Sequence, residues 1–446
     1  MTAADPARIG KGRLILFAAG DFAFNLYWQS AMLYLLFYYT DALAIGMETA
    51  AAIYLAASVW DGLVSFAVGV LADRRGSARH YRLALIVGAV PLGLAFVMTY
   101  MPPPVAGGAA VAFVLVGHLL FRTAYALVNI PYLAMSARIS PDTRDRSLVA
   151  GLRMLAGTAA AVVVAIGTVP VGSWLMGADA GPRAFLGAAL LFAGIASVLL
   201  VVVGWSFRDT VPPDDAPRAS IVAALAGVAR NRAFVTLAGA MMAMIVATTI
   251  LGKSVLYYFK YFLGDEPAGQ LALASMMAVS AAAVPVWMLI GRAIGVRRLW
   301  FLSIGLCSIG LTSFALVDLP RAGAMQLFLM AMQAATVGLH FAFWAMLPDT
   351  IEWGQRTTGQ RAEGTVFGLA ALLQRVAIGI ATAVLGVAFG SAGYTANIAQ
   401  APATLADMRM TIALVPLGFF LLSGVLMWLN PLRTGTHDAV RQELAR

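Results

Sequence analysis

The sequence predicts an all-α polytopic membrane protein with twelve transmembrane helices. Of its 446 residues, 61% are hydrophobic and only 11% are charged, which is more apolar than a soluble chain of this length could bury. Its apolar runs are continuous, whereas a transmembrane β-barrel would need alternating segments of about 10 residues. A chain of this composition can satisfy its backbone in lipid only as helices.

Twelve predominantly apolar windows of about 20 residues can be placed along the chain. They cover residues 14–38, 48–72, 83–101, 106–136, 148–172, 183–207, 233–262, 268–291, 299–318, 322–347, 364–390 and 408–430. The first window is too long for the core of a removable signal peptide, and no small-residue cleavage site follows it. We therefore expect it to remain in the mature chain as the first span.

The longest polar interruption divides the windows six and six. It predicts an N-terminal six-helix bundle at 1–207, a central cytoplasmic loop at 208–232 with a surface helix from Ser220, and a C-terminal bundle with its tail at 233–446. The loops "DRRGSARHYR" and "GRAIGVRR", after the second and eighth spans, are both short, basic and glycine-containing. Two similar halves in parallel are common among secondary transporters.

The distribution of basic residues orients the chain. With the N-terminus inside, 22 of the 30 Lys and Arg residues fall in the tails and inner loops and three in the outer loops. The positive-inside rule then predicts a multi-pass protein of the inner (plasma) membrane with both termini in the cytoplasm. The net charge of +9 follows from this topology and needs no nucleic-acid partner. A single cysteine, Cys307, excludes a disulfide framework and a cysteine-based metal cluster.

Six charged residues lie deep within the predicted spans. They are Asp21, Asp61, Arg122, Arg153, Lys253 and Arg375. Each would cost about 2.5–3.5 kcal/mol at the bilayer centre, roughly 15–20 kcal/mol in all. We therefore expect them to converge on a water-filled cavity lined by protein. Intramembrane ionisable groups usually mark functional sites, so Asp21 and Asp61 are interpreted as functional.

Helical spacing places polar residues on single faces of four spans. These faces comprise Asp21, Asn25 and Gln29 with Trp28 beside them; Ser58, Asp61 and Ser65; His118, Arg122, Tyr125, Asn129, Tyr132 and Ser136; and Thr336, His340 and Trp344. The alternative for an intramembrane Ser or Thr is a bond to a backbone carbonyl. For His118 and His340 the alternative is a packed, hydrogen-bonded ring.

The outer end of the seventh span carries a cluster of aromatic residues. Tyr257, Tyr258 and Tyr261 surround Lys260. Tyrosines at this depth are typical of an interfacial aromatic belt, and a lysine near a helix end can extend its ammonium group to the interface. The sequence therefore predicts a lipid-interface role for these four residues.

Five segments together resemble the glycoside-pentoside-hexuronide:cation symporters, a branch of the major facilitator superfamily that includes the melibiose permeases. They are "GDFAFNLYWQ", "LYLLFYYTDALAIG", "VWDGLVSFAVGVLADRRGSARHYR", "NIPYLAMSARISPDTRDRSLVAGLRML" and "AMLPDTIEWGQRTTGQRAEGTVFGLAALLQR". The likeness covers nearly the whole chain. It implies the major facilitator fold, with two six-helix bundles that rock around a central site.

The resemblance also implies roles for individual residues. Asp21 and Arg153 match positions that bind sugar hydroxyls, Asp61 matches a carboxylate of the cation site, and Arg375 matches a basic residue between the two sites. Six residues match inner-loop segments that help to close the cytoplasmic side. These cytoplasmic-gate candidates are Asp73, Arg74, Arg75, Asp142, Arg144 and Arg146.

The sequence departs from the melibiose permeases at the cation site. Ser65 replaces a second carboxylate, Val64 an amide-bearing residue, Ala126 a threonine and Asn129 an aspartate. Sodium prefers several oxygen ligands, as other hard cations do, and these changes remove them. The expected coupling cation is therefore H⁺ rather than Na⁺, with Asp61 and Ser65 as the coupling residues.

The solute site departs as well, because Leu133 replaces a tryptophan that stacks on galactosides and His340 replaces an aromatic residue. Four deep cations outnumber two deep carboxylates, and a positive cavity would attract a uronate or another acidic solute. The predicted solute-binding residues are Asp21, Asn25, Trp28, Asn129, Tyr132, Arg153, His340 and Arg375.

These features predict a secondary active transporter that carries a sugar-like solute by alternating access. No H-E-x-x-H, no G-x-S-x-G and no paired carboxylates on neighbouring turns of one span are present, so an enzyme is not expected. No cofactor is expected, and the protein should be a monomer in the bilayer. The alternative is an exporter or flippase of a lipid or amphipathic natural product, which the same fold could also form.

Overall fold

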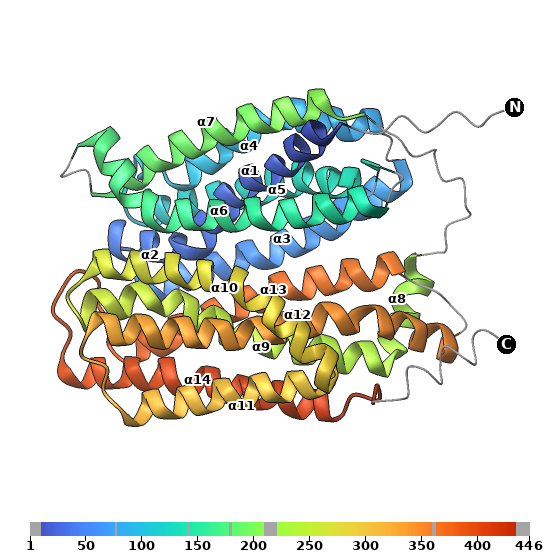
Figure 1. Ribbon diagram of the computed structural model, residues 1–446. Helices are drawn as coiled ribbons and strands as arrows, with labels where there is room; N and C mark the ends of the chain where they lie inside the picture. The colour runs from blue at the N-terminus through green and yellow to red at the C-terminus, as the bar shows by residue number, and fades with distance from the viewer. Residues whose placement is uncertain are drawn as a thin grey trace, which may run out of the picture. The chain divides into compact units, whose positions relative to one another are not determined.

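The computed structural model is helical throughout the part of the chain it describes, which is residues 10–75, 78–136, 138–140, 143–177, 181–208, 221–358 and 363–433. Its helices are α1 (Lys11–Leu33), α2 (Leu35–Phe37), the π-helix η1 (Tyr38–Ala42), α3 (Met47–Arg75), α4 (Ala78–Thr99), α5 (Gly108–Ser136), α6 (Thr143–Met176), α7 (Pro182–Ser206), α8 (Ile221–Arg230), α9 (Arg232–Tyr261), α10 (Glu266–Ile294), α11 (Val296–Leu316), α12 (Ala322–Thr358), α13 (Glu363–Ser391) and α14 (Pro402–Trp428). Figure 1 shows them in chain order.

The first predicted apolar window extends over α1, α2 and the start of η1, and each of the other windows coincides closely with one long helix. The short helix expected after Ser220 is α8. Within the described residues, eleven helices are long and apolar enough to cross a membrane. The twelfth long helix, α1, is less apolar because it carries Lys11, Arg13 and the polar series from Asp21 to Gln29. The prediction of an all-α polytopic membrane protein is therefore confirmed.

The chain divides into two compact units. Unit 1 comprises residues 1–38 and 63–215, and unit 2 comprises residues 39–62 and 216–446. The second unit thus includes η1 from Tyr39 onward and the first half of α3, which precede most of the first predicted bundle in the sequence. Helix α3 is the one element of the described chain that continues from unit 2 into unit 1.

Unit 1 is built around α1, which packs mainly on α6 and α7, while α4 packs on α5 and α7. Buried tyrosines join these helices, and their hydroxyls bond to backbone carbonyls. Tyr38 donates to the carbonyl of Tyr100 at 2.8 Å, and Tyr100 donates to that of Ser30 at 2.7 Å. These bonds satisfy polar atoms that burial removes from water.

Unit 2 is organised by α9, which packs on α13 and α14, and by α12, which packs on α10 and α11. In Figure 1 these helices run alongside one another. The start of α9 is fixed by Asn231, whose side chain accepts from the backbone N–H of Phe234 at 3.1 Å and donates to the carbonyl of Thr350 at 2.7 Å. This residue caps α9 and links it to α12.

The predicted aromatic belt at the end of α9 is wrong. Tyr257 and Tyr258 are 0% and 4% exposed, and Lys260 forms an ion pair with Asp41 of η1 instead of extending to the interface. The hydroxyls of Tyr257 and Tyr261 bond to groups of the protein. Tyr257 is buried and Tyr261 is half-buried, because groups of the folded chain take the place of the lipid interface that was predicted to surround them.

Candidate functional site

Two deep charges of unit 1, Asp21 and Arg153, meet in the middle of α1. Arg153 of α6 forms an ion pair with the Asp21 carboxylate through Nε, and its Nη2 lies 3.4 Å from the second oxygen. Tyr132 of α5 donates to the same carboxylate at 2.7 Å. The Arg153 and Asp21 side chains remain 21% and 17% exposed. Three helices therefore position one carboxylate that keeps part of its surface accessible.

A glycine allows this arrangement to form. An added Cβ at Gly20 would lie 2.6 Å from Cε2 of Tyr132, closer than real Cβ atoms approach other groups. The ring of Tyr132 also stacks on Phe17, with centroids 4.8 Å apart. The absence of a side chain at residue 20 thus lets the ring lie flat against α1 and aims its hydroxyl at Asp21.

The polar face predicted for α1 continues beyond Asp21. Asn25 donates to the Asp21 carbonyl at 2.9 Å, and Gln29 donates to Asn25 at 3.3 Å. Trp28 lies beside the ring of Tyr125, and the guanidinium carbon of Arg122 lies 5.2 Å from the Trp28 ring centroid. The predicted series is therefore a connected polar row in the structure.

In unit 2, Asp61 of α3 pairs with Arg375 of α13. The distance from Nη1 of Arg375 to the Asp61 carboxylate is 2.7 Å. The Asp61 side chain is 0% exposed and that of Arg375 is 20% exposed. This pair is similar in chemistry to the Asp21 pair, but its carboxylate is completely buried.

Close packing of α3 on α13 surrounds the Asp61 pair. A Cβ added at Gly379, one turn after Arg375, would lie 2.9 Å from Cβ of Ser58. About two turns before Asp61 on α3, the ring centroid of Tyr54 lies 3.8 Å from the ammonium group of Lys253. Lys253 and Tyr54 are 5% and 0% exposed. The buried carboxylate therefore lies in a tightly packed region that also holds a second cation.

These features match a known family. A family model described as "MFS/sugar transport protein" matches residues 16–434. The chain belongs to this family. The predicted resemblance to the glycoside-pentoside-hexuronide:cation symporters, within the major facilitator superfamily, is confirmed.

Individual relatives cover nearly the whole transporter. A "Glucuronide carrier protein homolog" of Escherichia coli (strain K12) is 25% identical over 432 residues, 94% of this chain and 92% of the relative. An "Inner membrane symporter YicJ" of the same organism is 25% identical over 423 residues, 92% and 89% of the two chains. Among solved structures, a bacterial homolog of the human lysosomal transporter Spinster has a TM-score of 0.70 at 10% identity and covers 98% of each chain. This last likeness concerns the fold alone.

The family assignment confirms the general function predicted from the sequence. The protein is a secondary active transporter for a sugar-like solute, integral to a membrane and multi-pass, and it is not an enzyme. A small-molecule solute and a coupling cation are its partners. The alternative of a lipid or natural-product facilitator is accordingly set aside.

The long polar stripe of α5 does not line an open cavity as expected. His118, Arg122, Tyr125 and Tyr132 are between 0% and 6% exposed. Arg122 donates from Nε to Nε2 of His118 at 3.1 Å, and Asn129 is half-buried on the same helix. Most of the stripe is buried because aromatic rings of α1 cover it, as Phe24 covers Tyr125 and Tyr132.

Two predicted residues, His340 and Ser65, have other surroundings than the two ion pairs just described. His340 of α12 is half-buried, and its Nδ1 lies 3.1 Å from the carbonyl of Thr336, which is the packed alternative considered for it. Ser65 lies one turn beyond Asp61 on α3. In the parts of the chain that the structure describes, no group of three His, Cys, Asp or Glu residues could hold a metal ion.

The cytoplasmic-gate candidates lie largely beyond what the structure describes. Asp142 is outside the described residues. The backbones of Asp73, Arg74 and Arg75 belong to α3, and those of Arg144 and Arg146 belong to α6, but their side chains are not among those described. The proposed closure by these residues stays a prediction.

Sequence reasoning missed one acidic residue, Asp41. It lies three residues beyond the first predicted window and was assigned no role, but its side chain is only 2% exposed. Two sequence signals could have indicated it: the aromatic run "YYTDA" continues the first span, and Lys260 and Tyr261 end the seventh span on the same side of the membrane.

Proposed function

We propose that the transporter is a symporter that couples the uptake of an anionic sugar, such as a uronide, to one proton. The contrast between the two carboxylate–arginine pairs carries this proposal. The Asp21 pair keeps surface for a solute, whereas the Asp61 side chain is 0% exposed and already paired with Arg375. Asp21 is thus the solute carboxylate and Asp61 the coupling carboxylate.

Solute recognition would centre on Asp21, Arg153 and Tyr132. The carboxylate can accept hydrogen bonds from sugar hydroxyls, and the guanidinium can bind hydroxyl or carboxylate oxygens in a forked geometry. Trp28, part-exposed on the same helix, offers a flat face for a sugar ring. Asn25, Asn129, His340 and Arg375 complete the proposed set of solute-binding residues.

The surroundings of Asp61 favour a proton over sodium. Sodium needs several oxygen ligands, and a sodium ion at Asp61 would lie next to the Arg375 guanidinium, 2.7 Å from the carboxylate. A proton needs neither additional ligands nor additional volume. Ser65, one turn away, is the second proposed coupling residue because its hydroxyl can exchange protons with water.

Coupling follows from competition for Arg375. When Asp61 is ionised, its carboxylate holds the guanidinium, as the 2.7 Å contact illustrates. A proton on Asp61 removes that charge, so Arg375 is released and becomes available to an anionic solute. Proton and solute binding then strengthen each other by the same factor, as linkage requires.

An anionic solute fits the balance of charge. The deep parts of the spans hold four basic and two acidic residues, and a positive site concentrates anions. The relative named as a glucuronide carrier homolog supports the same class. One proton moving with one monovalent anion carries no net charge, so such transport should follow the pH gradient and ignore the membrane potential.

The topology belongs to the same proposal. The basic inner loops favour an inner-membrane protein with both termini in the cytoplasm, and the relative named as an inner membrane symporter supports that location. A monomer is the proposed unit. The paired inner-loop charges from Asp73 to Arg75 and from Asp142 to Arg146 are the proposed cytoplasmic gate.

The decisive experiment measures solute-induced pH change in lightly buffered vesicles that contain the purified protein. Glucuronides and galacturonides are compared with neutral glycosides and pentosides, each with and without sodium. We expect external alkalinisation with a uronide, without a sodium requirement and without an effect of an imposed potential.

Two results would contradict the proposal. Sodium-dependent uptake without alkalinisation would mean that the coupling ion is sodium. Alkalinisation with neutral glycosides alone would retain proton coupling but reject the anionic solute. Vesicles containing the Asp61→Asn variant are the control, since they should show no solute-induced pH change with any compound.

A further inference from the structure

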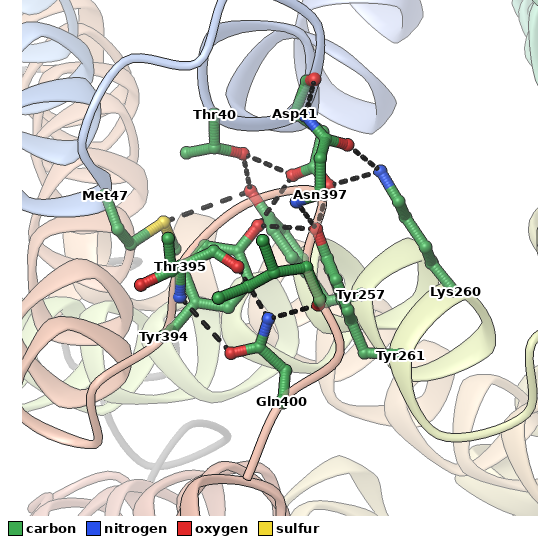
Figure 2. Close-up of polar contacts among 11 residues, drawn as sticks. Thr40, Asp41, Met47, Tyr257, Lys260, Tyr261, Tyr394, Thr395, Asn397 and Gln400 are labelled. Carbon is green, nitrogen blue, oxygen red and sulfur yellow. Dashed lines mark hydrogen bonds and ion pairs between the residues drawn. The ribbon is translucent and has the colours of Figure 1, made fainter.

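A second polar centre lies at the outer ends of the helices of unit 2, on the side that carries few basic loops. It consists of Thr40 and Asp41 from η1, Tyr257, Lys260 and Tyr261 from the end of α9, and Tyr394 and Asn397 from the loop between α13 and α14. We call these seven residues the outer latch. Figure 2 shows Asp41 at its centre, with groups of α9 and of the loop directed towards it.

The Asp41 carboxylate is saturated with donors. Its Oδ1 accepts from Lys260 at 2.7 Å and from Tyr261 at 2.5 Å, and its Oδ2 accepts from Thr40 at 2.7 Å and from Tyr394 at 2.8 Å. The side chain is 2% exposed. A buried carboxylate with four donors is stable only while all of them stay in place.

Further bonds tie the partners to one another. Asn397 donates from its side chain to the Asp41 carbonyl at 2.7 Å, and its side-chain oxygen accepts from Lys260 at 2.7 Å. Thr40 and Tyr257 share a hydrogen bond of 2.8 Å. Asn397 has a positive φ of 60°, a conformation that asparagine tolerates better than most residues. The network therefore connects three separate segments of the chain.

The local backbone presents Asp41 to these partners. The first span does not end at Leu33 but continues through α2 into the π-helix η1. A π-turn adds one residue per turn and rotates the following side chains relative to an α-helix, and such turns are frequent at functional sites. In η1 this turn directs the side chains of both Thr40 and Asp41 towards the other latch residues.

All seven latch residues belong to unit 2, although Thr40 and Asp41 come from the beginning of the chain. Residues 39–62 belong to unit 2, although residues 1–38 and 63–215 form unit 1. A transporter has to admit its solute from the outer side at one stage of its cycle, and a packed network at the outer ends of three elements obstructs that access. Buried polar networks tend to be complete or fully separated, because a half-formed one leaves unsatisfied groups.

We propose that the outer latch holds the outer entrance closed, and that Asp41 separates from Lys260 and the tyrosines whenever the transporter opens to the outside. Asp41 is thus a third functional carboxylate, a positioning residue that sets the balance between closed and open entrance. The proposal requires that the chain is a transporter, but not that its coupling ion is a proton.

Ionisation of the tyrosine hydroxyls is not expected to open the latch. Burial raises the pKa of Tyr394 well above its ordinary value, and the charges of Tyr257 and Asp41 raise it further. Its hydroxyl thus remains a donor at every physiological pH. The groups that face Asp41 are Lys260, the tyrosines, Thr40 and Asn397, and the Glu266 carboxylate of α10 interacts electrostatically with Asp41 and Lys260. Opening has to separate the hydrogen-bonded groups mechanically.

The test uses single cysteines in the full-length chain. Cys307, the only cysteine in the sequence, is buried and is first replaced by alanine. Met47→Cys then places a shallow reporter beside the latch, where Met47 is 5% exposed and its sulfur lies 3.9 Å from the Tyr257 hydroxyl. Asn25→Cys places a deep reporter beside Asp21. A membrane-impermeant maleimide is added to the outside of right-side-out vesicles.

We expect Asp41→Asn and Lys260→Gln each to increase labelling of both reporters about 10-fold. A 10-fold change in population corresponds to about 1.4 kcal/mol, and the loss of one charge-assisted hydrogen bond is sufficient to produce it. The double variant should label little faster than Asp41→Asn alone, because Asp41→Asn already removes the ion pair that Lys260→Gln disrupts. Tyr394→Phe keeps the ring and should give a smaller increase in labelling. It replaces the charge variants in the test if those variants fail to fold.

The matched control is Asp318→Asn. Asp318 also forms an ion pair at the outer ends of unit 2, with Arg409, but its side chain is 82% exposed. Exposed ion pairs contribute little to stability, so labelling of both reporters should stay unchanged in Asp318→Asn. Equal increases in this control and in Asp41→Asn would overturn the proposal, as would unchanged labelling in all latch variants. Faster labelling of the shallow reporter alone would also overturn it, since that result means local fraying without opening.

Discussion

The Asp21 pair and the Asp61 pair have the same chemistry in different environments. Each joins an aspartate to an arginine more than 130 positions away in the chain. The carboxylate of Asp21 is 17% exposed and that of Asp61 is 0% exposed. Tyr132 provides a further donor to Asp21, whereas close packing of α3 on α13 surrounds Asp61. In the function proposed above, accessibility and not residue type therefore separates the solute site from the proton site.

The comparison also separates affinity from coupling. The part-exposed Asp21 pair can exchange hydrogen bonds within the protein for hydrogen bonds to a solute at small cost. Removal of this pair should therefore weaken solute binding. A buried pair can change only by gaining a proton or by moving apart, because an uncompensated charge is expensive there. Removal of the buried pair should therefore abolish the coupling between the pH gradient and solute accumulation, while the solute site itself stays intact.

Replacing Asp61 should have the largest effect. Asp61→Asn cannot carry the coupling proton, so a pH gradient should no longer drive accumulation. With one proton per solute, a gradient of two pH units supports about 100-fold accumulation, since each unit is worth about 1.36 kcal/mol. Accumulation in the variant should fall to equilibrium, while solute exchange across the membrane continues.

The measurement is steady-state uptake of the uronide into vesicles with an imposed pH gradient, paired with counterflow to show that the protein is folded and mobile. Asp61→Glu is the conservative control and should retain part of the gradient. Accumulation by Asp61→Asn at the level of the unmodified protein would exclude Asp61 as the coupling carboxylate.

Replacing Asp21 should act on affinity instead. Asp21→Asn removes the charge that orients Arg153 and accepts sugar hydroxyls, at a cost of about 1.5–3 kcal/mol for charge-assisted bonds. The KM for the solute should therefore rise about 10- to 100-fold, with accumulation at saturating solute unchanged. Initial rates over a range of concentrations give the KM. Lost accumulation with an unchanged KM would reverse the assignment of the two aspartates.

Much of this arrangement could be predicted from the sequence. The spans, the helix α8 and the polar row of Asp21, Asn25 and Gln29 follow from local composition and helical period, which need no tertiary information. The choice of Asp21 and Asp61 rested on the cost of a charge in lipid. These features depend on residues within a few turns of one another.

The pairings and the burial could not be predicted in the same way. Arg122 was expected in a cavity but lies against Trp28 and His118, because the rings of α1 cover its face of α5. Asp41 and Lys260 are more than 200 residues apart in the chain, and their pairing depends on how η1 meets α9. Which residues of two distant segments contact each other depends on how the helices pack, and the helical periodicity of the sequence gives no information about it.

Gly20 offers a way to disturb the Asp21 pair without touching a charge. In Gly20→Ala the new Cβ would press on the Tyr132 ring, whose nearest atom lies 2.6 Å from the added atom, and overpacking of this kind costs about 1–3 kcal/mol. The displaced hydroxyl would leave Asp21, so we expect reduced thermal stability and a KM several-fold higher.

Gly12→Ala on the same helix is the matched control. Nothing lies within 4 Å of a Cβ added there, and alanine is the better helix former by about 1 kcal/mol. This variant should be as stable as the parent or slightly more so, with an unchanged KM. Equal behaviour of the two variants would show that the contact between residue 20 and Tyr132 does not shape the solute site.

The smallest effect should come from the Tyr132 hydroxyl alone. Tyr132→Phe keeps the ring that stacks on Phe17 and removes a donor 2.7 Å from the Asp21 carboxylate. A hydrogen bond of this kind is worth about 1 kcal/mol, which corresponds to roughly a five-fold higher KM. Because Asp21 keeps Arg153, accumulation and its dependence on the pH gradient should not change. A loss of coupling in this variant, measured in the same vesicles, would mean that the exposed pair also takes part in proton transfer, and the separation of the two sites by accessibility would then fail.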